Sequence, residues 1–237
     1  MNAYEVSRFA QILSQNEYPG CGIALGMTPD GKRSVALCFI TGRTLNSRNR
    51  FFVEEEDGVG IRAFEPKLIQ DARHILYRPV YETDRGLILA NGDQSDILRD
   101  YLSVGKSWEA ALRSYGFEDD RPNATPRISG LLCKDGSYRL SVLKAESTLG
   151  RGCARSFYEY APVPGLGHYL HSYDCHDAPV PPSLTGEPRC LSVCNDMELF
   201  ADILWDQLNG KNKISLFLRY TDLETGEYEQ RIFNKRK

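Results

Sequence analysis

Turn signals recur along this chain, and each of them separates two short runs of strand-forming residues. The clearest signals are Asp30-Gly31, Asp57-Gly58, Asp135-Gly136 and Thr225-Gly226. Residues of these types favour tight turns, so each signal predicts a β-hairpin. A chain built mainly from hairpins forms antiparallel sheets. We therefore expect an α+β fold in which a few helices cover antiparallel sheets.

The hydrophobic pattern gives the positions of the expected elements. Paired strands are expected at residues 21–27 and 34–40, 51–54 and 61–64, 80–83 and 86–90, 128–133 and 138–144, and 214–220 and 228–233. Helices are expected at residues 3–16, 95–104, 107–115 and 196–208. Residues 150–190 are rich in Gly, Pro, Tyr and His, and their pattern gives no strand order.

The composition is that of a globular protein, with 41% hydrophobic and 26% charged residues. For 237 residues we expect one domain over residues 1–237, with a helical extension at 1–17 and a divergent, loop-rich region at 150–190. The seven scattered cysteines are typical of a reducing cytosol. The sequence shows neither a signal-peptide pattern nor an apolar run of membrane-spanning length, so a cytoplasmic protein is expected.

The net charge of −3 argues against nucleic acid as the main partner. A local group of arginines can still bind a small anion inside an acidic protein. One candidate is Arg127, because Pro126 fixes its own φ and pushes Thr125 towards extended geometry. Arg127 is therefore expected at a rigid strand entrance, where its planar guanidinium suits a phosphate or a planar carbonyl.

Asn91 and Gly92 form a second candidate, because they follow an expected strand and precede an expected helix. Gly lets a backbone approach a ligand, and the start of a helix offers free N–H groups to an anion. An ordinary Asn-Gly turn is the alternative interpretation. A third polar segment, residues 43–50, carries three arginines.

Five pieces of the chain occur in a characteristic order, namely residues 18–26, 43–48, 75–77, 87–96 and 125–127. In this order and spacing, the chain resembles the archaeal-type inosine monophosphate (IMP) cyclohydrolase family over residues 18–145. The resemblance implies a four-layer α/β/β/α sandwich of antiparallel sheets, similar to the N-terminal-nucleophile hydrolases. It also implies an enzyme of de novo purine biosynthesis that closes 5-formamidoimidazole-4-carboxamide ribonucleotide to IMP, with loss of water.

The resemblance also assigns roles to individual residues, with Tyr77, Glu118 and Arg48 as the catalytic ones. A phenol such as Tyr77 can donate to an oxyanion or pass a proton, although most tyrosines in such runs are core aromatics. One extra residue near Glu118 leaves Asp119 and Asp120 as alternative acids, and a solvated surface arginine is the alternative for Arg48. The implied substrate-binding residues are Arg127, Asn91, Gly92, Asp96 and Arg50.

No cofactor is expected, because the implied ring closure needs none and the sequence has no dinucleotide or Walker pattern. His168, His171, Cys175 and His176 lie close together, but their spacing fits no standard zinc site and no metal is expected. The expected partner is a purine-pathway ribonucleotide, with neither nucleic acid nor membrane. A homo-oligomer is also expected, and the sequence does not specify the number of subunits.

Two other functions remain open at the level of sequence. The first is a binding module that keeps the nucleotide site and has lost the chemistry. The second is an amidohydrolase of the N-terminal-nucleophile type, which needs a Ser, Thr or Cys at a processed N-terminus. Cys21 is the nearest candidate for that role, and cleavage after Gly20 would have to expose it.

Overall fold

Strand pairing organises the chain into two seven-stranded sheets. The computed structural model describes residues 5–69, 72, 74–147, 150–174 and 178–236. The first sheet has the spatial order β1 (Ser7–Arg8), β12 (Arg189–Ser192), β11 (Leu166–His171), β2 (Cys21–Met27), β3 (Arg33–Thr41), β13 (Lys213–Asp222) and β14 (Tyr228–Asn234). The second has the order β10 (Cys153–Tyr160), β9 (Tyr138–Ala145), β8 (Arg127–Cys133), β7 (Gly86–Ala90), β6 (Val80–Thr83), β5 (Gly58–Arg62) and β4 (Phe51–Glu55).

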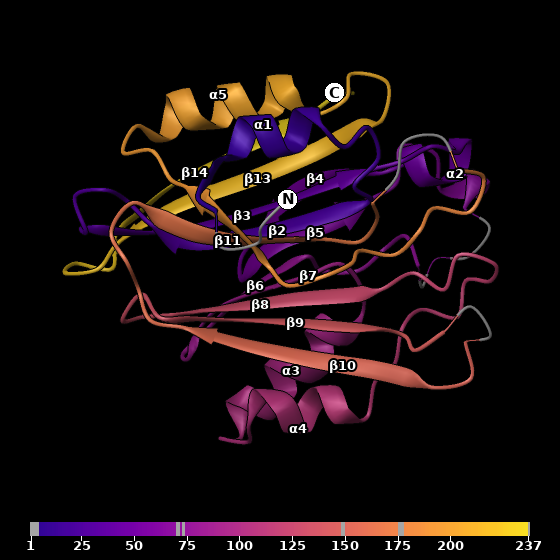
Figure 1. Cartoon of the computed structure of the whole chain (residues 1–237), viewed down its shortest axis with the longest axis horizontal. Coiled ribbons are helices and arrows are strands. Elements are labelled where there is room, and N and C mark those ends of the chain that lie inside the picture. The colour runs from indigo at the N-terminus through magenta and orange to yellow at the C-terminus, as the bar shows by residue number, and fades with distance from the viewer. Residues whose placement is uncertain (1–4, 70–71, 73, 148–149, 175–177, 237) are drawn as a thin grey trace.

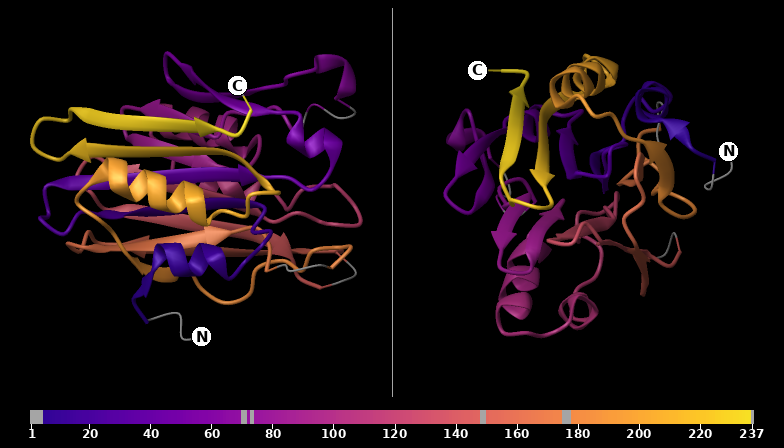
Figure 2. Two further views of the ribbon diagram at one scale, coloured as in Figure 1. Left: turned by 90° about the horizontal axis from the view of Figure 1, so that it is seen from above. Right: turned by 90° about the vertical axis from the view of Figure 1, so that its left-hand side faces the viewer.

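The two sheets lie face to face, and helices cover their outer faces (Figures 1 and 2). Helices α1 (Phe9–Ser14) and α5 (Met197–Gln207) pack on the first sheet, and α3 (Gln94–Ser103) and α4 (Trp108–Arg113) pack on the second. One cluster of buried side chains fills the space between the sheets, and one further cluster lies under each helix pair. The mixed α+β class is therefore confirmed, with layers in the order helix, sheet, sheet, helix.

Local turn chemistry closes the predicted hairpin of β8 and β9. In the turn between β8 and β9, the backbone N–H and hydroxyl of Ser137 donate to Asp135 Oδ1 at 3.0 and 2.6 Å. Gly136 supplies the φ of +83° that this turn needs. Among the predicted hairpin strands, the largest difference is at β5, which starts at Gly58 directly after its turn, three residues before the predicted 61.

At one end of the sandwich, a polar bridge joins the two sheets. Arg219 on β13 donates to Glu82 Oε2 on β6 at 2.8 Å, and to Gln230 Oε1 on β14 at 2.8 Å. Its guanidinium carbon also lies 3.8 Å from the centre of the Tyr228 ring. With only 5% of Arg219 exposed, these partners are what stabilise its charge in a buried position.

Two sequence predictions need correction. The helix predicted at residues 3–16 is only Phe9–Ser14 in the described chain, because Ser7 and Arg8 form a parallel pair with Leu191 and Ser192. The second concerns residues 150–190, where no strand order was predicted and the structure contains β10, β11 and the start of β12 between its loops. Strand β11 pairs with β2 and β12 pairs with β1, which are far away in sequence and are not revealed by a local pattern, whereas β10 pairs with β9 directly before it.

His168 and His171 do not converge. Residues three apart on a strand face opposite sides of the sheet. His168 Nδ1 therefore lies 2.7 Å from the Tyr138 hydroxyl between the sheets, whereas His171 Nε2 on the outer face lies 3.0 Å from Asp174 Oδ1. Cys175 and His176 lie outside the described residues.

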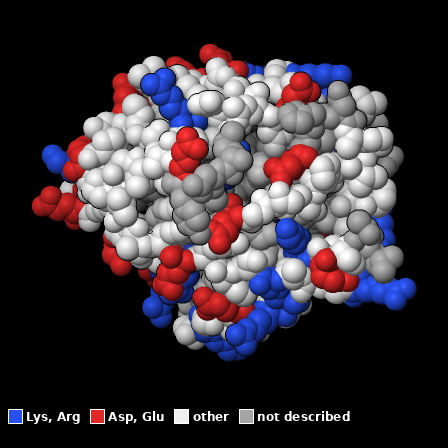
Figure 3. Space-filling model, viewed as in Figure 1, with Lys and Arg blue, Asp and Glu red and all other residues white. Residues whose placement is uncertain are grey.

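The surface shows no single charge sign on the face drawn in Figure 3, where acidic and basic side chains are interspersed. Within the part of the chain that is described, no helix has the length and apolar character needed to cross a membrane.

Helix α5 offers a matched test of the layer order. Leu204 is fully buried against the first sheet, whereas Leu199 on the same helix is 52% exposed. We expect Leu204→Ala to lower the free energy of unfolding by about 2–5 kcal/mol, because it leaves a cavity. Leu199→Ala should stay within about 0.5 kcal/mol of the parent protein. Urea unfolding measures both, and equal losses would contradict the packing of α5 described above.

Candidate active site

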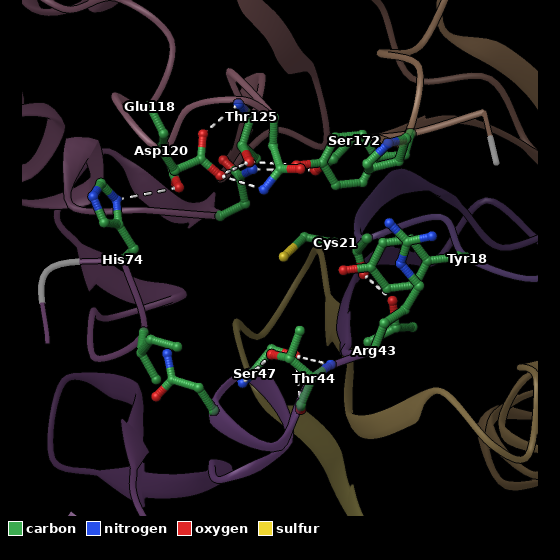
Figure 4. A pocket seen from close by; sticks show the side chains of 18 of the residues that line it. Tyr18, Cys21, Arg43, Thr44, Ser47, His74, Glu118, Asp120, Thr125 and Ser172 are labelled. Carbon is green, nitrogen blue, oxygen red and sulfur yellow. Dashed lines mark hydrogen bonds and ion pairs between the residues drawn. The ribbon is translucent and has the colours of Figure 1, made fainter. Parts of the chain in front are cut away.

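A cleft of about 380 Å³ opens at the end of the sandwich opposite the Arg219 bridge. The ends of several strands converge at this cleft. Cys21 starts β2, Thr41 ends β3, Asn91 follows β7 and Ser172 follows β11. Figure 4 shows the side chains of both sheets and of the connecting loops around this cleft.

The amide of Asn91 ties three segments of the cleft wall together. Its Nδ2 donates to Pro126 O at 2.8 Å and to Ser172 Oγ at 3.2 Å. Its Oδ1 accepts from Ile128 N at 2.8 Å and from Gln94 Nε2 at 3.0 Å. Asn91 thus lines the cleft, as the binding prediction requires, but its amide hydrogen bonds are made to the protein itself.

Gly92 provides space for two charged side chains. A Cβ at this position would lie 2.6 Å from an Nη of Arg127 and 3.0 Å from Glu118 Oε1. Arg127 is only 9% exposed, and it contacts the Asp93 carboxylate and Gln94 Oε1. Neither Gly92 nor Arg127 lines the cleft, so the structure places them behind Glu118.

Glu118 is the buried acid of the cleft, with 5% of the residue exposed. Burial raises the pKa of its carboxyl, while a hydrogen bond from His74 and the charge of Arg127 oppose this shift. The alternative acids differ from it. The Asp119 side chain is 94% exposed, and Asp120 accepts hydrogen bonds from the backbone and hydroxyl of Thr125. Of the three, Glu118 is the one that is buried at the cleft.

Tyr77, Cys21 and Arg50 line the floor of the cleft. The Tyr77 hydroxyl lies 3.6 Å from Cys21 Sγ, and burial raises the pKa of Tyr77 well above its usual value. The phenol therefore stays protonated and can donate a hydrogen bond. Arg50 is 6% exposed, and its Nε has no hydrogen-bond partner among the described residues. The floor thus combines a neutral donor with a buried cation.

The opposite wall carries aromatic rings and hydroxyl groups. The Tyr18 and Tyr173 rings stack with centroids 5.8 Å apart, and the Arg43 guanidinium carbon lies 4.5 Å from the centre of the Tyr18 ring. Thr44 and Ser47 cap the short helix α2 (Leu45–Arg48) through reciprocal hydrogen bonds of 3.0 and 3.1 Å. This capping holds both hydroxyl groups at the cleft wall.

The remaining predicted residues lie away from the cleft. Arg48 donates to Gly42 O at 2.8 Å and to Asn212 Oδ1 at 3.1 Å, so its guanidinium is used in joining loops. Asp96 accepts a 2.6 Å hydrogen bond from the Tyr81 hydroxyl. The cleft therefore brings together four of the predicted residues, namely Tyr77, Glu118, Asn91 and Arg50.

Several lining residues were not identified from sequence. His74 directly precedes the 75–77 piece, and Arg43, Thr44 and Ser47 lie in the arginine-rich segment, so proximity to these motifs was their only signal. Ser172 lies in the 150–190 region, where no pattern was readable.

Comparison with protein families gives a match over most of the chain. The family model described as IMP cyclohydrolase-like protein matches residues 18–226. The chain belongs to this family. The match extends well beyond residue 145, so it includes β10 to β13 as well as the pieces recognised in the sequence. Comparison with individual curated proteins gives no match.

The space at Gly92 can be tested by filling it. We expect Gly92→Ala to destabilise the protein by about 1–3 kcal/mol, because the new methyl group would push against Arg127 and Glu118. Gly210→Ala is the matched control, since nothing lies within 4 Å of its added Cβ, and it should change stability by less than about 0.5 kcal/mol. Thermal unfolding of both variants decides the point, and similar melting temperatures would refute the close approach.

Proposed function

We propose that this protein is an IMP cyclohydrolase, which closes 5-formamidoimidazole-4-carboxamide ribonucleotide to IMP with loss of water. One observation carries the proposal, namely the convergence of Glu118, Tyr77 and Arg50 in a single cleft. They supply a proton acceptor, a neutral donor and a buried cation. Family membership supports the same reaction class.

The ring closes when the carboxamide nitrogen of the substrate attacks the formyl carbon of the same molecule. The Glu118 carboxylate takes a proton from that nitrogen as the C–N bond forms. The electron pair of the C=O bond moves to the formyl oxygen. Arg50 and the Tyr77 hydroxyl hold the resulting negative charge, as donors in an oxyanion hole do.

Loss of water completes the reaction. Protonated Glu118 returns its proton to the oxygen and generates a hydroxyl group. The formamide nitrogen then loses its own proton as the C–O bond breaks, and that proton leaves with the hydroxyl as water. Both reacting groups belong to one molecule, so the protein mainly orients them and stabilises charge. This scheme calls for no metal or organic cofactor.

Charge fixes the direction in which the nucleotide lies. Glu118 and Asp120 repel a dianionic phosphate, so the reacting groups and not the phosphate belong at their end. Arg43, Thr44 and Ser47 lie across the cleft from these acids (Figure 4). We assign the 5′-phosphate to that side. Arg127, which the sequence suggested for this role, supports Glu118 from behind instead.

The fold supports a further part of the proposal, a relationship to the N-terminal-nucleophile hydrolases, because two antiparallel sheets lie between helical layers. One observation favours an amidohydrolase as second candidate, since Cys21 starts β2 and lines the cleft. Burial raises the pKa of the Cys21 thiol, however, which disfavours the reactive thiolate.

The direct test is incubation of the purified protein with the formamido ribonucleotide, with ultraviolet absorbance reporting purine formation. Turnover supports the proposal. Binding of IMP without turnover would replace it with the binding module. Active protein that has lost residues 1–20, with Cys21 at its N-terminus by mass spectrometry, would favour the amidohydrolase.

Tyr77→Phe tests the phenol. We expect the maximal rate to fall by about 10²-fold or more, because the hydroxyl acts in the transition state. Nucleotide affinity should hardly change, and the ring still packs, so the melting temperature should hold. Tyr101→Phe on α3 serves as the control and should keep the parent rate. A stable and fully active Tyr77→Phe protein would exclude the role.

A pair of arginine variants separates Arg50 from Arg48. Lysine keeps the charge of either residue but loses the planar set of donors. Arg50→Lys should reduce turnover by roughly tenfold to 10³-fold, because Arg50 lines the cleft beside Tyr77. Arg48→Lys should lower the melting temperature and leave turnover near normal, since Arg48 joins Gly42 to Asn212. Steady-state kinetics that show the reverse order would return the catalytic role to Arg48.

A further inference from the structure

His74 is a cleft residue to which neither the sequence nor the family comparison gives a role. Its Nδ1 lies 3.4 Å from Glu118 Oε2, and the side chains of His74 and Glu118 are 25% and 7% exposed. Figure 4 shows the imidazole at one edge of the cleft, directed towards the carboxylate. His74 thus lies between the buried acid and solvent.

The two oxygens of Glu118 have different surroundings. Oε1 lies on the side of Gly92 and Arg127, whereas Oε2 meets His74. This difference fixes the plane of the carboxylate, with an imidazole on one side and a guanidinium beyond the other. The charged or titratable groups that act on or with Glu118 are His74, Arg127, Asp120, Arg50, Tyr77, Cys21 and Tyr173.

We propose that His74 is the positioning residue of the cyclohydrolase base: its Nδ1–H orients the Glu118 carboxylate in the cleft and favours its ionised form. The role of Glu118 as a base rests on the proposed function. The pairing of His74 with Glu118 rests on the geometry alone. Because one-quarter of the His74 side chain reaches solvent, the imidazole also offers a route by which the buried acid exchanges its proton.

The direction of the pH effect follows from the partners of Glu118. Burial raises the pKa of this carboxyl, and the hydrogen bond from His74 lowers it. Removal of His74 should therefore raise the pKa of Glu118 further. A larger fraction of the acid would then be protonated at a given pH, and an activity that needs the carboxylate would lose its acid limb at a higher pH than in the parent enzyme.

The experiment is a ¹³C NMR titration of the Glu118 carboxyl in the full chain without nucleotide. His74→Leu removes the donor, His74→Asn keeps an N–H near the position of Nδ1, and Asp119→Asn removes a neighbouring charge that is 94% exposed. We expect a higher pKa for Glu118 in His74→Leu, recovery towards the parent value in His74→Asn, and little change in Asp119→Asn. Identical titrations in the parent and His74→Leu proteins would overturn the proposal.

Two further measurements keep the result decisive. If His74→Leu does not fold, Glu118→Gln provides the reciprocal test, because His74 loses a carboxylate partner and its imidazole pKa should fall. An unchanged imidazole titration would overturn the pairing. The profile of kcat/KM against pH should shift its acid limb upwards in His74→Leu and recover in His74→Asn. A parent protein without turnover would reject the proposed function and still leave the two titrations to decide the pairing.

Discussion

The hydrogen bonds of Asn91 are the interaction on which the geometry of the cleft depends. This one amide joins the end of β7, the entrance of β8 and the segment after β11, and therefore links the two sheets at their open end. Buried amides with all bonds made are rigid, because a lost partner leaves an unsatisfied polar group. The position of Gly92, the next residue, is therefore fixed as well. The side chains of Arg127 and Glu118 pack beside Gly92 and are fixed with it.

The charges around the cleft are unevenly distributed. Buried acid lies at one side, with Arg127 behind it and His74 in front, while hydroxyl groups and Arg43 lie across the opening. Arg50 and Tyr77 occupy the floor between them. Little of this arrangement requires movement before a ligand arrives, since most of the polar groups are already held by protein partners. Such preorganisation is the condition under which fixed donors stabilise a transition state effectively.

The sequence predicted what local chemistry determines and missed what distant pairing determines. The turn at Asp135-Gly136 closes through its own side chains, so its hairpin was readable. Strands β11 and β12 pair with β2 and β1, which are distant in sequence, and the pairing of β1 shortens the predicted N-terminal helix for the same reason. At the cleft, the resemblance brought attention to Tyr77, Glu118 and Arg50. The resemblance did not reveal side-chain direction. The prediction therefore also included Arg48 and Asp96, which are close in sequence to cleft residues but whose side chains point elsewhere.

The turn between β13 and β14 has a consequence for how the chain can be rebuilt. Asp222 Oδ1 accepts from the backbone N–H groups of Glu224 and Thr225 at 2.9 Å, so the turn is closed by its own residues. Nothing lies within 4 Å of a Cβ added at Gly226, and the turn projects at the end of the sandwich away from α2 (Figure 1). Exposed turns of this kind tolerate insertions and new chain termini. Circular permutation at this turn, or the grafting of a second domain into it, would leave every strand end at the cleft in place.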